Sequence, residues 1–363
     1  MFSALISLSA AWNLFIFFHE IDAVPSFTEE PSNPSRVNEG DNITLRWTYD
    51  IDGTFRDSTF TWVPTGDTIA LKDSSGLTVV PAFSDHVQVI ILDSEATLTL
   101  LHVNRSDDGD YQYFIRNTNF RSTTSTVNVF VQFKPENVQL STNATGNQAC
   151  LGSYLNFTCS VGTHGNPEVY YYQLFRNDTF LGTSSSGEWI RMLSSSGVFT
   201  YKCQANNTVG ATNSTAVTIT VGVKPTVTFK RCPTPVTEGH NATLYCNATG
   251  YPVPNFAWIN ASSGNIESPT KTLVITAITR SQRGIYICHA SNEIGNGTQT
   301  CEIDVYYRPS SSSITTIPSN YTVLRGSNVS FTCTTDANPP ANMYHFYFKG
   351  SLLESSSSGM LRW

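Results

Sequence analysis

Eight cysteines are the residues in this chain with the widest range of possible chemistry. They are Cys150, Cys159, Cys203, Cys232, Cys246, Cys288, Cys301 and Cys333. No Cys-x-x-Cys sequence occurs and the seven histidines are scattered singly, so we expect no metal site. The remaining chemistry is disulfide formation, which requires an oxidising compartment.

Sequence motifs of nucleophilic, zinc-dependent and nucleotide-dependent catalysis are absent. The chain has no Gly-x-Ser-x-Gly, His-Glu-x-x-His, Walker A or Gly-x-Gly-x-x-Gly sequence. The acidic run Asp107-Asp108-Gly109-Asp110 lacks the spacing and the final Glu of an EF-hand, and we interpret it as a corner between two strands. We therefore predict that the protein is not an enzyme and uses no cofactor.

Asparagine glycosylation is the second chemistry that the sequence offers. Asn-x-Ser/Thr sequons occur at Asn42, Asn104, Asn143, Asn156, Asn177, Asn206, Asn213, Asn241, Asn247, Asn260, Asn296, Asn320 and Asn328. They follow an apolar segment, Phe2 to Phe18, which we interpret as a secretory signal cleaved after about Ala23. The alternative is a short membrane anchor, although a span needs roughly 20 apolar residues. We predict a glycoprotein of the secretory pathway, either secreted or held at the cell surface by an anchor outside this chain.

Composition and charge narrow the class of protein further. A chain of 363 residues predicts two to four domains, and its richness in Ser, Thr, Val and Tyr favours strands over helices. The net charge is −7, and no block of Lys or Arg occurs. Nucleic acid and polybasic membrane contacts are therefore not expected.

A repeated pattern of about 85 to 105 residues organises the chain. Its clearest copy begins with the alternating segment 239–246, which ends at Cys246. Trp258 follows, and the copy closes with Tyr286 and Cys288. Alternation places one set of side chains on the buried face of a strand, so the pattern predicts two packed sheets.

These residues resemble the immunoglobulin superfamily. The resemblance implies an all-β fold of tandem immunoglobulin-like β-sandwiches, in which Cys246 and Cys288 bridge the two sheets and Trp258 packs on the bridge. Tyr286 would tie the adjoining turn to the backbone.

The same pattern divides the chain into four units after the signal. We predict a signal peptide over 1–23, a V-type unit without the core disulfide over 24–132, an immunoglobulin-like unit over 134–222, an I-set/C2-type unit over 225–306 and a truncated unit over 309–363. Tyr172 or Leu174 is expected in the tryptophan slot of the second unit, and Phe346 in that of the fourth. Linker prolines such as Pro225 are expected to stiffen a rod and to discourage a continuous strand.

The first unit departs most from the pattern. Trp47 and Tyr113 stand at the two cysteine positions, and the long interval between them leaves room for the extra strand pair of a variable-type domain. Trp62 is predicted to be the core tryptophan. His86 is expected where such domains carry the Arg that pairs with Asp107.

The resemblance also implies how the cysteines pair. Cys159 pairs with Cys203, Cys246 with Cys288, and Cys232 with Cys301. Cys333 is interpreted as having lost its partner to truncation. Cys150 is left as a free thiol, an inter-chain bridge or a partner of Cys333.

The first unit is also where we expect binding. If Tyr111, Tyr113 and Ile115 point inward, their neighbours on the strand point to solvent. The candidate binding residues are Thr61, Val63, Gln112, Phe114 and Arg116. Phe114 beside Arg116 is typical of an interface centre, since aromatic residues and Arg are enriched in hot spots. The alternative is that Phe114 is covered by a neighbouring loop.

Three functional hypotheses follow. The first is non-enzymatic cell-surface recognition and cell–cell adhesion, with homophilic binding of the first unit to the same protein on an opposing cell. The second is the ectodomain of an immune-type signalling receptor. The third is a secreted matrix or humoral binding protein. Each has a protein partner and neither nucleic acid nor a small-molecule substrate.

Overall fold

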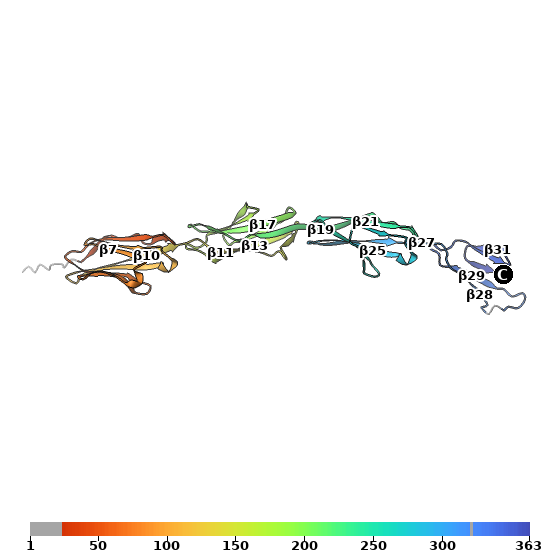
Figure 1. Ribbon diagram of the computed structural model, residues 1–363, viewed down its shortest axis with the longest axis horizontal. Helices are drawn as coiled ribbons and strands as arrows, with labels where there is room; N and C mark the ends of the chain where they lie inside the picture. The colour runs from red at the N-terminus through yellow and green to blue at the C-terminus, as the bar shows by residue number, and fades with distance from the viewer. Residues whose placement is uncertain (1–23, 320–321) are drawn as a thin grey trace, which may run out of the picture.

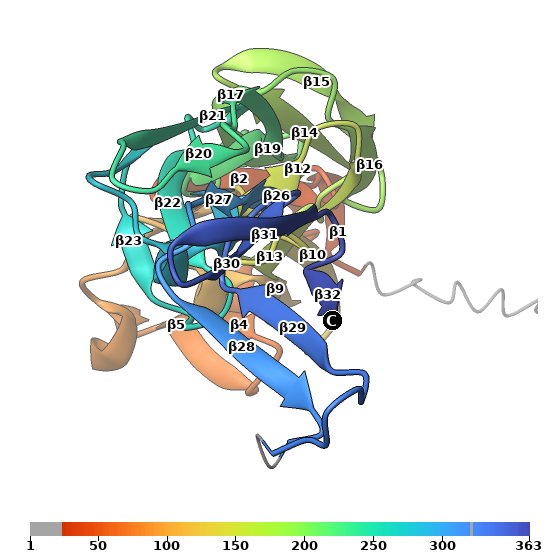
Figure 2. The same ribbon diagram turned by 90° about the vertical axis from the view of Figure 1, so that its right-hand side faces the viewer.

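The computed structural model describes residues 24–319 and 322–363. The predicted signal peptide 1–23 and the sequon at Asn320 lie outside the described residues. The units follow one another as an elongated rod in Figure 1 and lie one behind another in the end-on view of Figure 2. The described part of the chain consists of strands and three short 3₁₀ turns, and it contains no helix that could span a membrane.

Two sheets form the first unit. One has the order β1-β3-β8-β7, and the other has the order β2-β10-β9-β4-β5-β6. The first contains β1 (Ser26–Glu29), β3 (Ile43–Asp50), β7 (Val87–Ile91) and β8 (Glu95–Leu100). The second contains β2 (Ser35–Asn38), β4 (Phe55–Trp62), β5 (Asp67–Asp73), β6 (Gly76–Val79), β9 (Gly109–Asn117) and β10 (Ser122–Gln132). The pair β5-β6 extends the larger sheet in the manner of a variable-type sandwich.

The second unit has a three-stranded sheet packed against a larger one. The small sheet contains β11 (Glu136–Thr142), β13 (Tyr154–Thr163) and β16 (Glu188–Met192). The larger sheet contains β12 (Gln148–Cys150), β14 (Tyr171–Arg176), β15 (Thr179–Ser184), β17 (Gly197–Asn206), β18 (Ala211–Asn213) and β19 (Val217–Arg231).

The third and fourth units complete the rod. The third contains β20 (Val236–Thr237), β21 (Ala242–Tyr251), β22 (Asn255–Asn260), β23 (Ile266–Ser268), β24 (Thr272–Ile275), β25 (Gly284–Asn292), β26 (Gly295–Ile303) and β27 (Val305–Tyr306). The fourth contains β28 (Ser312–Ile317), β29 (Ser330–Thr335), β30 (Tyr344–Phe348), β31 (Ser351–Ser356) and β32 (Met360–Arg362).

The first three units each have their own buried core. In the third, Trp258 lies opposite Cys288 in the strand pairing, and Cys288 is bonded to Cys246. In the second, Leu174 lies opposite Cys203 and is fully buried, so Leu174 rather than Tyr172 fills the tryptophan slot. Since each of these three units buries its own apolar side chains between two sheets, each is a separate domain.

Two of the three joints between units are held by an arginine of a 3₁₀ turn. Arg105, in η2 (Arg105–Asp107), contacts Glu39 of the first unit at 3.0 Å and Glu136 of the second at 2.6 Å. The guanidinium also lies 3.9 Å from the ring centroid of Phe133 in the linker. The side-chain hydrogen bond to Arg105 lowers the pKa of Glu136, so this ion pair stays charged near neutral pH.

Arg280 repeats this arrangement between the third and fourth units. It begins η3 (Arg280–Gln282) and contacts Glu238 and Asp336, each at 2.8 Å. Its guanidinium lies 4.0 Å from the ring centroid of Tyr307. An arginine that pairs with both units and stacks on the linker restrains bending at the joint.

The joint between the second and third units corrects one expectation. Strand β19 continues through Pro225 and pairs with both β17 and β21. The pairing with β21 shifts register between Val223 and Thr226, so Pro225 sits at an irregular position where its missing N–H breaks no regular ladder bond. The proline is therefore compatible with a continuous strand here.

Candidate functional site

The outward side of the six-stranded sheet in the first unit is the candidate site, and it is called the front face from here on. Residues in β9 alternate in burial, with Tyr111, Tyr113 and Ile115 buried beneath it. Its outward residues in β4, β5 and β9 include Asp57, Thr59, Thr61, Leu71, Asp110, Gln112, Phe114 and Arg116, and Val63 lies just beyond β4. All five candidate binding residues therefore lie on one surface.

A row of side chains crosses the centre of the front face. Strand pairing aligns Thr124, Phe114, Thr59, Leu71 and Thr78 across five neighbouring strands. Phe114 is half-buried, and Leu71 has 39% of its surface exposed. Threonine methyl groups surround both apolar side chains, so the centre of the face is uncharged and weakly polar.

The charged groups beside this central row contact one another, since Asp57 accepts hydrogen bonds from both Arg116 and Arg56. Arg116 contacts Asp57 on the neighbouring strand through two hydrogen bonds, at 2.6 and 3.1 Å. Its guanidinium lies 5.8 Å from the ring centroid of Phe114. Arg116 is thus held beside Phe114 by Asp57 rather than free in solvent, so little side-chain entropy is left to lose on binding.

An aromatic residue at the distal end of the front face was not predicted from the sequence. Phe120, in the turn between β9 and β10, is 66% exposed. Arg56 lies 3.9 Å from its ring centroid and also contacts Asp57, which connects Phe120 to the Arg116 pair. Buried Asn117 orders this turn by accepting hydrogen bonds from the backbone N–H groups of Asn119 and Arg121. The sequence signal that could have identified Phe120 is the presence of an aromatic residue within a polar turn.

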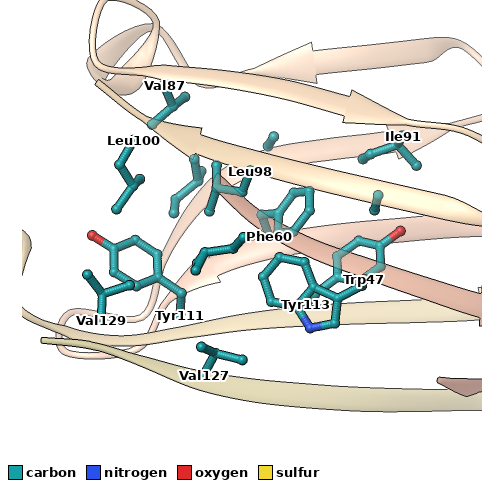
Figure 3. Packing of buried hydrophobic residues seen from close by; sticks show 14 of the residues in the cluster. Trp47, Phe60, Val87, Ile91, Leu98, Leu100, Tyr111, Tyr113, Val127 and Val129 are labelled. Carbon is teal, nitrogen blue, oxygen red and sulfur yellow. The ribbon is translucent and has the colours of Figure 1, made fainter. Parts of the chain in front are cut away.

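The core beneath the front face corrects the prediction for Trp62. Phe60, not Trp62, lies opposite Tyr113 and stacks on it with ring centroids 4.4 Å apart. Trp47 packs against both rings, at 5.5 and 5.6 Å, as Figure 3 shows. Trp62 lies one inward position further along, opposite Tyr111, and packs only partly buried against the same core.

Polar contacts hold this aromatic cluster in place. The Trp47 indole N–H donates to Ser125 Oγ at 2.8 Å, and the Tyr113 hydroxyl donates to the Tyr49 hydroxyl at 3.4 Å. The Tyr49 hydroxyl in turn donates to the Leu92 carbonyl oxygen at 2.6 Å. Burial raises the pKa of both tyrosines, so both hydroxyls remain protonated near neutral pH.

The corner at the base of β9 has the arrangement that the acidic run suggested. The Tyr111 hydroxyl donates to the Asp107 carbonyl oxygen at 3.1 Å, and Tyr286 makes the same contact with Gln282 at 3.0 Å. His86 Nε2 lies 2.9 Å from Asp107 Oδ2, where variable-type domains are expected to carry Arg. Asp107 therefore stabilises this corner through both its carboxylate and its carbonyl oxygen.

Within residues 24–319 and 322–363, no cluster of three potential ligands could hold a metal ion.

Sequons are distributed unequally along the rod. In the first unit only Asn42 and Asn104 are sequons, and both lie in turns near the joint to the second unit. The front face carries none. The remaining sequons lie in the following units. Among them Asn206 is buried, with its side-chain amide donating to the Gln204 carbonyl oxygen at 3.3 Å.

Three disulfides are present and two cysteines are free. The bonded pairs are Cys159–Cys203, Cys232–Cys301 and Cys246–Cys288. Cys150 is exposed on β12, and Cys333 is partly buried in β29. The first unit contains no cysteine at all, so its two sheets are held by packing and hydrogen bonds alone.

The sandwich geometry and these disulfides define a class of protein. Residues 137–221 and 224–292 each match a family model described as an immunoglobulin domain. The chain belongs to the immunoglobulin superfamily and is built of tandem immunoglobulin domains, which confirms the predicted all-β fold class.

The curated proteins that resemble this chain are distant relatives. The chain is 29% identical to the limbic system-associated membrane protein of Rattus norvegicus over 216 residues, which are 55% of this chain and 61% of that protein. It is 27% identical to neural cell adhesion molecule 1 of Mus musculus over 300 residues, 75% of this chain and 26% of that protein. It is 24% identical to the peroxidasin homolog of Mus musculus over 326 residues, 87% of this chain and 21% of that protein. The chain thus spans less than two thirds of each of these curated relatives.

A solved structure extends the likeness over nearly the whole rod. The ICAM-5 D1–D4 ectodomain fragment matches with a TM-score of 0.52 and 12% identity, covering 94% of this chain and 90% of that one. At this level of identity the match shows the fold alone.

Proposed function

We propose that this protein mediates non-enzymatic recognition at the cell surface, as a cell–cell adhesion protein that binds a protein partner through the front face of its first unit. The observation that carries the proposal is a surface that combines partly or fully exposed apolar side chains with an absence of sequons. Phe114 and Leu71 lie at its centre, and Phe120 lies at its distal end. Exposed apolar clusters rimmed by polar groups are typical of protein interfaces.

Distant similarity to adhesion molecules supports this class of function. Glycans on the later units would shield their surfaces, whereas the front face stays open to a partner. The family models matched by the chain are immunoglobulin domains only, which supports binding rather than catalysis.

We propose further that the partner is a second copy of this chain on an opposing cell. The front face is suited to meeting its own copy because the row of side chains across its centre, from Thr124 to Thr78, is uncharged. Two copies that meet along this row bury no isolated charge there, which avoids a main penalty in apposing identical surfaces. A heterophilic partner is the alternative, and it has no comparable observation in its favour.

Replacing Phe114 with alanine is expected to weaken self-association about tenfold or more, because truncating a central aromatic residue removes an interface anchor. The measurement is the aggregation of beads coated with the secreted chain, with the concentration for half-maximal aggregation as the readout. Leu77→Ala is the control, because Leu77 pairs with Lys72 and lies on the opposite side of β6 from Thr78. Equal aggregation of Phe114→Ala and native beads, with an unchanged unfolding midpoint, would contradict this role.

A further inference from the structure

The small sheet of the second unit exposes an apolar cluster that its own fold leaves uncovered. Tyr154 of β13 is 66% exposed, and Ile190 and Met192 of β16 are 68% and 57% exposed. Tyr154 lies opposite Met192 in the strand pairing. These three side chains, here called the β13–β16 patch, therefore form one continuous surface, and contiguous exposed apolar surface is unusual in a soluble domain.

The sequon residue Asn156 directly adjoins this patch. It stands directly opposite Ile190 and one outward position after Tyr154. Its neighbours Leu155 and Phe157 are buried, so the Asn156 side chain points outward with the patch. Asn156 is exposed, and its side chain makes no hydrogen bond to any residue in the described part of the chain.

The other half of the sequon is equally accessible. Thr158 is exposed on the same face, two residues along β13. The Ser141 hydroxyl donates to its carbonyl oxygen at 3.3 Å, and the Thr158 hydroxyl makes no hydrogen bond within the described residues. On the other side of β13, the Asn143 side-chain oxygen accepts a hydrogen bond from the Asn156 backbone N–H at 2.9 Å. Both the acceptor amide and the hydroxyl of the Asn156 sequon are thus free.

We propose that Asn156 carries an N-linked glycan whose first sugar packs over the β13–β16 patch. Attachment forms a bond between Asn156 Nδ2 and C1 of the first N-acetylglucosamine. It breaks the bond from C1 to the diphosphate of a lipid-linked oligosaccharide donor, and Nδ2 loses a proton as the lipid diphosphate leaves. The C–H face of the sugar then covers the Tyr154 ring, and the neighbouring apolar side chains lose contact with water.

A covalent glycan fits this patch better than a protein partner does. Asn156 completes a square with the three apolar side chains, so a glycan attached there would hold a protein surface away from all of them. A sugar attached to Asn156 is already held next to the patch, so it loses no translational freedom when it packs there. A small apolar surface is therefore sufficient to hold it. The patch is therefore a glycan platform and not a docking site.

The test uses the full chain expressed through the secretory pathway, comparing Thr158→Val, which destroys the sequon, with Thr158→Ser, which preserves it. Mass spectrometry after enzymatic deglycosylation measures occupancy of Asn156. We expect occupancy in the native chain and in Thr158→Ser. In Thr158→Val we expect an unfolding midpoint of the second unit lower by about 4 °C and stronger binding of an apolar dye. An unoccupied Asn156 in the native chain would overturn the proposal.

A second set of variants, in which the apolar patch is absent, distinguishes packing of the sugar on the patch from any general effect of the glycan on stability. The triple variant Tyr154→Ser, Ile190→Thr, Met192→Thr removes the patch, so loss of the glycan should then leave the midpoint unchanged. An equal drop in both backgrounds would also overturn the proposal. The inference shares with the proposed function only passage through the secretory pathway. Neither occupancy nor the midpoint depends on adhesion, so a failure here leaves the front face untouched.

Discussion

Replacing Tyr113 with alanine is expected to lower the free energy of unfolding of the first unit by about 4 kcal/mol, which is a large fraction of the stability of an ordinary domain. Tyr113 is fully buried and contacts Phe60, Trp47 and Tyr49 with ring centroids 4.4 to 5.9 Å apart. Its removal leaves a large cavity where other units have a disulfide. The measurement is urea unfolding of residues 24–134 followed by tryptophan fluorescence.

Tyr113→Phe is the matched control, because it keeps the ring and removes only the hydroxyl that contacts Tyr49. Its expected cost is about 1 kcal/mol. Since burial raises the pKa of Tyr113, the folded unit keeps this proton longer than the unfolded chain does. The stability that the neutral Tyr113 hydroxyl contributes is fully present below about pH 10, the pKa of an unfolded tyrosine, and is lost as the pH rises above that value. Equal destabilisation by alanine and phenylalanine would show that the ring is not what holds the sheets together.

Reduction of the disulfides should destabilise the second and third units but not the first. Breaking Cys159–Cys203 or Cys246–Cys288 is expected to cost the second or third unit about 4 kcal/mol, because each bond closes a long loop, of 44 or 42 residues in sequence separation. The first unit has no cysteine and should unfold at the same midpoint with or without dithiothreitol. The measurement is calorimetric unfolding of the full chain with and without reductant. A shift of the first unit's transition under reduction would contradict this account of its core.

Local patterns were sufficient to predict much of this architecture. The alternation in β9, with Tyr111 and Tyr113 inward, predicted which side chains form the front face. The recurring Cys-Trp-Tyr-Cys pattern and its departures predicted two-sheet units. These features depend on neighbours within one strand, and period-two alternation is a local property.

The errors arose where a long-range contact decides between local alternatives. Phe60 and Trp62 share the same inward parity in β4, so the sequence alone did not show which of them faces Tyr113. Pairing of β4 with β9 settles that choice. Pro225 was expected to interrupt a strand, but a register shift opposite β21 accommodates it. Phe120 was overlooked because its partner Arg56 lies far away in the sequence.

The central proposal is that the front face of the first unit binds the partner. Glycans added to one or the other sheet of this unit can test that proposal. Thr59→Asn creates a new sequon over positions 59–61 in the middle of the front face, between Phe114 and Leu71. Thr97→Asn creates one over positions 97–99 on the opposite sheet, beside Ile90, which is 56% exposed. Both changes replace an outward threonine in the interior of a sheet, so they form a matched pair.

The decisive measurement is bead aggregation by the native chain and these two variants, with occupancy of each new sequon verified by mass spectrometry. Native and Thr97→Asn beads are predicted to aggregate equally, while Thr59→Asn beads remain dispersed, because a glycan excludes a second copy from the front face. Aggregation of Thr59→Asn beads at the native level would contradict the front face as the binding surface, and dispersed native beads would contradict self-association.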